Sequence, residues 1–248
     1  MLQGMYALAG QRPAKTTDSP VDVIVQRGNN YGEMYVTPSC PDGLTAYLNE
    51  SSYFAGLLSG YTPGTGFTAS TQATFSDTSA MLMLKNNAPL NGPPVTIRPD
   101  TLKLICSNVG AGITAMRLVA VLDDVSRWGT PGGAAMSFLP AGNVGTVQGP
   151  ISQAVIGNLG SGSPTGNKRF VGQCMLKAAA PVLNDEIIIR FSNAAQPSAG
   201  IAASTASSIV RHIEPVIVAP GKMLILHAYF TGVTTGAQFE PVLTVIER

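Results

Sequence analysis

The C-terminal stretch Pro215–Arg248 sets the strongest limit on how this chain can fold. In its middle run, Lys222–Phe230, every second side chain is apolar, while the opposite face also carries the polar tips of His227 and Tyr229. A period of two is that of a β-strand with one face on a dry core. This strand therefore needs a sheet that packs against a second layer on its apolar side.

The stretch as a whole predicts three strands in succession: Pro215–Val218, Lys222–Phe230 and Gln238–Glu247. Pro220 and Gly221 separate the first two, because proline presets φ and glycine supplies the positive φ of a type II turn. The second connection is short and bracketed by glycines. We therefore expect the last two strands to pair with each other as an antiparallel hairpin.

Alternating runs of the same kind recur along the rest of the chain, about 8 to 15 residues apart. The clearest are Val21–Gln26, Thr101–Ser107, Thr114–Leu122, Arg169–Lys177 and Glu186–Ser192. No amphipathic helices are inserted between them, which favours a sandwich over a βαβ fold. The prediction is an all-β chain, built as an antiparallel β-sandwich with at most one or two short helices.

Three segments are expected to depart from the strand pattern. Leu44–Leu58 favours a short helix, because its leucines and aromatic residues recur at helical spacing. Two Gly-, Ser- and Ala-rich segments predict long loops, near residues 134–168 and 192–207. Weak strands are predicted inside the first of these loops, at Gly145–Gln148 and Gln153–Ile156.

The N-terminal residues give no sign of export. Residues 1–20 hold irregularly spaced apolar residues and are expected to form an extended arm, with residues 21–248 as a single sandwich domain. The apolar run Met5–Ala9 is short and has no basic residue ahead of it, unlike the start of a signal peptide. We expect the protein to remain where it is made or to leave by lysis, with no membrane partner.

Charged residues make up 12% of the chain, about half of the usual quarter. A chain of this size with so few charges is expected to cover much of its surface with protein partners; the alternative is a neutral polar surface of Ser, Thr and Asn. The formal net charge of +1 argues against nucleic acid as a partner, because such a partner requires a concentrated basic excess.

The cysteines and histidines do not form a metal-binding pattern. Cys40, Cys106 and Cys174 lie far apart, and we expect them to be buried free thiols of a protein that folds in a reducing compartment. His212 and His227 are the only histidines, and neither belongs to an H-x-H or H-x-x-x-H pair. The sequence predicts no metal site and no cofactor.

Catalytic motifs are also missing. Gly160–Lys168 resembles a phosphate-binding loop, but its glycines, lysine and hydroxyl residues are out of order. Asp123-Asp124 and Asp185-Glu186 are acidic pairs at strand ends, and neighbours on an extended chain point to opposite faces. We interpret these four acids as solvated strand ends; a catalytic pair drawn from both sites is the alternative. The chain is expected not to be an enzyme.

Trp128 is the only tryptophan, and it lies beside Arg127 in an expected loop. An aromatic ring next to a cation is a candidate platform for a sugar or a base. The structural alternative is a ring that plugs one end of the sandwich or contacts another subunit.

Three stretches carry a resemblance to a known family: Pro93–Gly112, Arg117–Gly133 and Glu214–Phe230. Together with the low charge, the small-residue loops and the closing C-terminal strand, they resemble virion structural proteins of tailed bacteriophages. The resemblance implies a sandwich of jelly-roll type that is assembled in copies on a capsid or tail. It brings no catalytic residues.

This resemblance implies a capsid decoration (cement) protein or similar shell component of the virion, made in the host cytoplasm. Its expected partners are further copies of itself, with a trimer as one option, and other virion proteins such as the major capsid protein. The N-terminal arm and the two long loops would make the contacts. The alternative is a receptor- or glycan-binding sandwich of a tail or head fibre that uses Trp128 and Arg127.

Overall fold

The computed structural model describes residues 25–28, 34–37, 52–58, 64–91, 95–124, 133–141, 150–160, 167–192 and 208–248. The chain divides into two compact units, Met1–Asn49 and Glu50–Arg248. In the first unit, β1 (Val25–Gly28) and β2 (Met34–Thr37) pair as an antiparallel hairpin, so a strand is found at the end of the predicted Val21–Gln26. The predicted arm, residues 1–20, lies outside the described residues.

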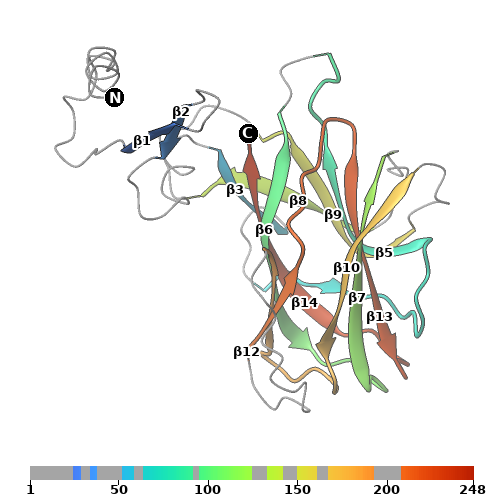
Figure 1. The fold of residues 1–248 in the computed structure, drawn as a ribbon. Helices are drawn as coiled ribbons and strands as arrows, with labels where there is room; N and C mark the ends of the chain where they lie inside the picture. Colours follow the sequence, from blue (N-terminus) through green and yellow to red (C-terminus); the bar gives the residue numbers. More distant parts are fainter. Residues whose placement is uncertain are drawn as a thin grey trace, which may run out of the picture. The chain divides into compact units, whose positions relative to one another are not determined.

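The second unit holds a sheet of twelve strands, and its described residues contain no helix. The strands are β3 (Tyr53–Leu58), β4 (Phe67–Thr68), β5 (Ser79–Asn86), β6 (Ile97–Asn108), β7 (Ala115–Asp123), β8 (Ala134–Pro140), β9 (Ser152–Gly160), β10 (Lys168–Lys177), β11 (Glu186–Phe191), β12 (Ser208–Ile213), β13 (Met223–Thr231) and β14 (Gln238–Glu247). Their order is β10-β7-β13-β5-β9-β8-β3-β14-β6-β11-β12, with β4 added to β14 (Figure 1).

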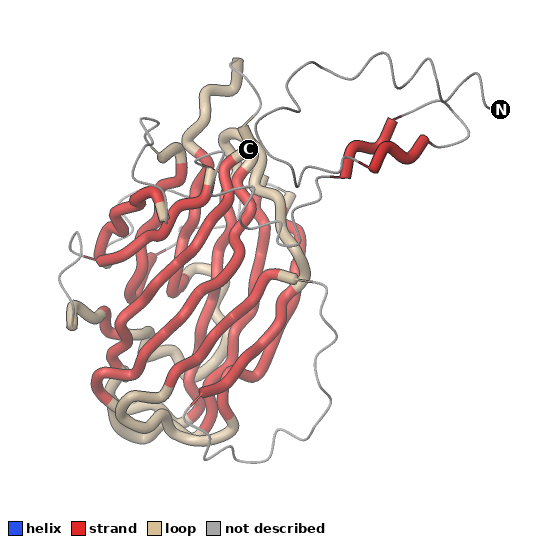
Figure 2. The backbone as a smooth tube through the Cα atoms, turned by 90° about the vertical axis from the view of Figure 1, so that its left-hand side faces the viewer, coloured by secondary structure: helices blue, strands red, loops and turns tan. Residues whose placement is uncertain are grey.

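The sheet is mostly antiparallel and curls until its two outer strands, β10 and β12, face each other. Only the β11–β12 pair is parallel among the described strands. The loop predicted near residues 192–207 lies, except for Ser192, outside the described residues. Strands make up most of the unit, and the loops gather at its two ends (Figure 2). The all-β class is therefore confirmed, and the nearly closed sheet fits the predicted sandwich of jelly-roll type.

One large apolar core lies between the two layers of this curled sheet. β13 contributes Leu224, Leu226 and Phe230, and β14 contributes Phe239 and Leu243, all of which are buried. These residues are the alternate positions that the period of two predicts. The alternation in the C-terminal stretch therefore identified the core correctly.

The predicted pairing of the last two strands is wrong. β13 pairs with β5 and β7, whereas β14 pairs with β3, β4 and β6. The connection between them is held instead by residues near Ala111, whose backbone N–H donates to Thr235 O at 3.0 Å and whose carbonyl accepts from Thr234 N at 2.9 Å. A short connection requires the two strand ends to be close, but it does not require the strands to pair. Here the connection crosses from one layer of the sandwich to the other.

The turn predicted before β13 is confirmed. Gly221 has a φ of 72°, and Lys222 N donates to Ala219 O at 3.0 Å, which closes the four-residue turn. The strand predicted at Pro215–Val218 is reduced to an isolated bridge between Val218 and Ile97.

The predicted helix is wrong where it can be compared with the structure. Tyr53–Leu58 is strand β3, between β14 and β8, while residues 44–51 lie outside the described residues. Side chains in β3 alternate between buried and partly exposed, and Gly56 lies directly against the ring of Phe138. Here glycine allows close packing of two strands, so the pattern of large apolar residues at helical spacing was coincidental.

The long loop predicted near residues 134–168 is also corrected, because β8 and β9 lie within it. The weak strand at Gln153–Ile156 is part of β9, and the one at Gly145–Gln148 lies outside the described residues. Gly157, with a φ of 143°, sits where the register of β9 against β5 shifts. Gly157 therefore marks an irregularity within a strand, although the glycine content of this segment is typical of a loop.

Candidate functional site

The candidate contact pair Trp128 and Arg127 belongs to residues 125–132, which lie outside the described residues. The sugar platform at this loop therefore stays a prediction. The stretch that resembles a phosphate loop connects β9 to β10, so it lacks the helix that would follow such a loop. Its Lys168 forms a salt bridge with Asp77.

The two acidic pairs are divided between the core and the surface. Asp123 and Asp185 are buried, whereas the Asp124 and Glu186 side chains are 32% and 35% exposed. Neighbouring acids thus point to opposite faces, as predicted. The interpretation of all four as solvated strand ends is wrong for Asp123 and Asp185.

Asp185 is buried because it forms an ion pair with Lys177, whose side chain is 2% exposed. The Asp185 carboxylate also accepts a 2.6 Å hydrogen bond from Val182 N, and its backbone carbonyl accepts one of 2.9 Å from Cys106 N. Two buried charges that satisfy each other in this way avoid the cost of isolated desolvation. The pair fixes the β10–β11 connection to β6, which is a structural role.

The two histidines lie in separate places. His227 is buried and donates from Nδ1 to Ser79 O at 2.7 Å, which makes it an interior polar tip. His212 Nδ1 lies 3.0 Å from Ser192 Oγ. Among the described residues there is no group of three His, Cys, Asp or Glu side chains that could hold a metal ion.

Cys106 and Cys174 are buried free thiols, as predicted, and Cys40 lies outside the described residues. Burial raises the pKa of Cys174 to about 11, and the charge of Arg211 opposes this rise in part. Burial, and then the charge of Asp185, also raises the pKa of Cys106. Because the thiolate is the reactive form, both thiols are poor nucleophiles at neutral pH.

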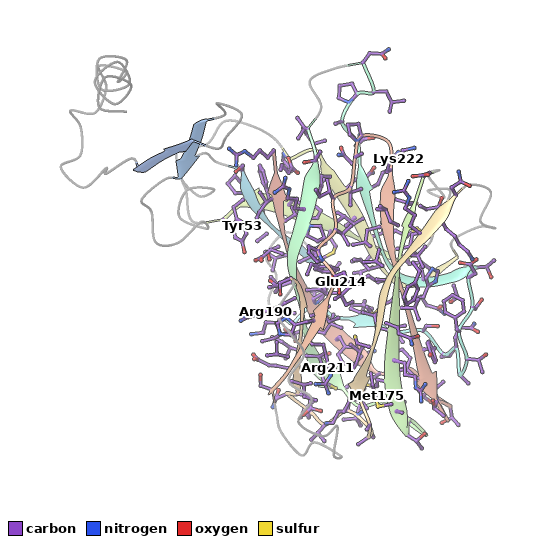
Figure 3. The ribbon with its side chains drawn as sticks, viewed as in Figure 1. Tyr53, Met175, Arg190, Arg211, Glu214 and Lys222 are labelled. Carbon is purple, nitrogen blue, oxygen red and sulfur yellow. The ribbon has the colours of Figure 1, made fainter. Side chains whose placement is uncertain are left out.

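The seam between β10 and β12 is bridged by a side chain. Arg211 lies on the same side of β12 as the buried Ile209 and Ile213, and its Nε donates to Met175 O at 2.6 Å. Both residues lie in the lower half of the unit (Figure 3). No backbone ladder joins the two strands there, so Arg211 closes the sheet at this point.

A hollow of about 410 Å³ lies on the outer face of β10, β7 and β13. Its floor is formed by Val119 and Val121 of β7, and rings of Phe75, Phe170 and Tyr229 line its sides. The hollow is completed by Gln173 and Lys168 of β10. Sequence reasoning placed Tyr229 on this mixed face but missed the others, because only the strand order brings them together.

Both ends of the sandwich expose large apolar side chains. The upper apolar patch consists of Leu90, 77% exposed, and Ile217, 52% exposed. Leu90 lies against Gly221, in the turn that ends at Lys222, whose position Figure 3 shows. Next to Ile217 in the chain, Val218 is held by the buried Asn86, whose side chain donates to Val95 O and Val218 O at 2.8 Å.

The lower apolar patch consists of Val109, Val182 and Leu183, which are 41–58% exposed. Val109 and Val182 border a second hollow of about 410 Å³. The two patches lie at opposite ends of β13. Its first residue, Met223, follows the upper turn and pairs with Asp123 at the end of β7. Its last residue, Thr231, pairs with Ala115 at the start of β7, on the side of the lower patch.

Among the described residues there is no helix with the length and apolar character to cross a membrane. Comparisons of the chain with protein-family models, with curated proteins and with solved structures gave no match.

Proposed function

We propose that the chain is a structural, non-enzymatic subunit of a virus particle of the tailed-phage type, which assembles in several copies. The observation that carries this proposal is the pair of apolar patches at opposite ends of the sandwich, in a chain with only 12% charged residues. Exposed apolar surface of this kind is typical of sites that other proteins cover.

The free energy available from burying these exposed side chains favours subunit contacts over chance exposure. Full burial of a leucine or valine side chain contributes about 1.5–3 kcal/mol, and Leu90 is exposed over most of its surface. A few such side chains at each end could anchor a contact between subunits. A contact at these surfaces would remove few charged groups from water, since Lys, Arg, Asp and Glu together are scarce throughout the chain.

In this proposal the core of the sandwich stabilises the folded subunit. The two ends of the sandwich contact neighbouring copies or the major capsid protein. The role is that of a decoration (cement) protein or similar shell component, which stabilises the particle through protein contacts. The resemblance of Arg117–Gly133 and Glu214–Phe230 to phage virion proteins supports the choice of particle.

Size-exclusion chromatography with light scattering tests the proposal. We expect a mass of several chains of 25.7 kDa each at micromolar concentration, or binding of the protein to purified capsids. A monomer at all concentrations that also fails to bind capsids would rule out the proposal.

A further inference from the structure

We infer that the hollow on the outer face of β10, β7 and β13 binds carbohydrate, and that the ligand is a sugar ring bearing a carboxylate. This site is separate from the two apolar patches, so it goes beyond the assembly role and does not depend on it.

Aromatic rings flank the hollow on two sides. Phe170 on β10 is 64% exposed, and Phe75 is 44% exposed on the side of β13. Between them, Val119 and Val121 give a floor that is more than nine-tenths buried. The C–H face of a pyranose ring packs on an aromatic face as other apolar groups do, so the rings that line the hollow can contact one sugar unit.

The rings on the β13 side are held in place before any ligand arrives. Phe75 stands edge-on to His227, with ring centroids 5.4 Å apart, and to Tyr229 at 6.5 Å. His227 is itself fixed by its hydrogen bond to Ser79 O. A preformed wall reduces the entropy that binding must otherwise remove, which favours a small ligand.

Polar groups that suit a sugar lie around these rings. The register places Gln173 opposite Val119 and Arg117 opposite Tyr229, on the outer face. Neither the Gln173 amide, the Arg117 guanidinium nor the Tyr229 hydroxyl forms a hydrogen bond or ion pair with another described residue. A planar amide and a hydroxyl suit sugar hydroxyl groups, and a guanidinium can bind a carboxylate through two parallel hydrogen bonds.

The size of the hollow favours a sugar over a second protein chain. A volume of about 410 Å³ falls within the range of about 300–1,000 Å³ for small-molecule pockets. A stable protein interface instead needs roughly 800 Å² from each partner. Arg117 lies opposite the lining residue Tyr229 and forms no ion pair with another described residue. Its positive charge favours an acidic sugar over a neutral one, because a carboxylate can pair with the guanidinium.

A glycan array with neutral, uronate-bearing and sialate-bearing oligosaccharides tests the inference. We expect the wild-type chain to bind acidic members. Calorimetric titration with the tightest of these and with its carboxyl-reduced form should show a loss of about tenfold in affinity on reduction, the equivalent of one charge-assisted contact.

Two variants assign the binding to the hollow. Phe170→Ala and Arg117→Met change exposed side chains, so the fold should be kept, and each should weaken binding about tenfold. Arg117→Met should also remove the preference for the acidic form. Leu90→Ser, at the upper end, is the matched control and should bind as the wild type does.

Three results would overturn the inference. The first is an array with no bound glycan. The second is full binding by Phe170→Ala together with its loss in Trp128→Ala, which would move the site to the other candidate platform. The third is a change in oligomeric mass caused by Phe170→Ala, which would identify the hollow as a contact between copies. If the oligomeric mass of Phe170→Ala equals that of the wild type, the hollow takes no part in assembly. The sugar-binding proposal and the assembly proposal can then be judged separately.

Discussion

The Nε of Arg211 lies 2.6 Å from the carbonyl oxygen of Met175, and this bond joins β12 to β10 where the sheet has no backbone ladder. A hydrogen bond with a charged donor contributes about 1.5–3 kcal/mol. Arg211→Met should therefore lower the free energy of unfolding by about that amount, as measured by urea denaturation.

Arg190 provides the control for this prediction, because it lies on the neighbouring strand β11 and is exposed (Figure 3). Arg190→Met should change the free energy of unfolding by less than about 0.5 kcal/mol. Equal losses in the two variants would show that Arg211 does not close the seam.

The buried ion pair of Lys177 and Asp185 gives a second prediction. Lys177→Met should cost about 3–5 kcal/mol of stability, because it leaves a buried carboxylate without its cation. Adding Asp185→Asn should recover much of the loss, since the amide oxygen can still accept the bond from Val182 N. Thermal and urea unfolding of the two variants measure this coupling.

The surface pair Lys103–Glu186 is the comparison, with its nitrogen and oxygen 2.6 Å apart and both side chains about one third exposed. Lys103→Met should cost no more than about 1 kcal/mol. A loss in Lys177→Met that is no larger than this would contradict the burial of the ion pair.

Gly112 and Gly232 hold together the two connections that cross between the layers. Gly112 has a φ of 75°, and a Cβ there would lie 2.4 Å from the carbonyl oxygen of Gly232. Gly112→Ala should therefore destabilise the protein by at least about 1–3 kcal/mol. Gly160→Ala, where a Cβ would meet nothing within 4 Å, should have little effect on the midpoint of thermal unfolding. If both variants unfolded at the same temperature, the close approach at Gly112 would be incorrect.

The two buried thiols predict how stability changes at high pH. The folded-state pKa of Cys174 is raised from 9.0 to about 11 by burial, and the pKa of Cys106 is raised too. Such groups stabilise the fold fully below their unfolded pKa, and this contribution is lost as pH rises through the folded pKa. Stability should thus fall between about pH 9 and pH 11.

Thiol labelling at pH 8 checks the same feature directly. In a Cys40→Ser background, native protein should react with a disulfide reagent far more slowly than urea-unfolded protein does, because both remaining thiols are protonated and buried. Rapid labelling of the native protein would contradict the burial of Cys106 and Cys174.

The strands were predictable because their side chains alternate. β7, β11, β13 and β14 begin and end within two residues of the predicted runs. The turn at Gly221 was predictable for the same local reason, since a Pro-Gly pair fits only a few backbone conformations.

The partners of the strands were not predictable from local patterns. The short link after β13 indicated a hairpin, but contacts between residues 110–114 and 232–237, more than a hundred positions apart, carry the chain across the core. In β3, large apolar residues at helical spacing indicated a helix, and in β9 a glycine at a register shift indicated a loop. These are cases in which tertiary contacts decide what the local sequence leaves open.

The outer-face hollow was missed for a related reason. Phe75, Phe170 and Tyr229 belong to a loop and two strands, and they share one face only because β7 lies between β10 and β13. The local sequence around one exposed aromatic residue does not indicate which residues of other strands lie beside it.

The most direct test of assembly is sedimentation velocity on variants of the two ends. A chain with Leu90→Ser and Ile217→Ser at the upper patch and Val182→Ser and Leu183→Ser at the lower patch should sediment as a monomer, while the wild type sediments as a multimer. Val210→Ser, on the outer side of β12 and 38% exposed, should remain multimeric. A multimer of unchanged mass in the four-site variant would contradict the claim that the apolar ends join the subunits.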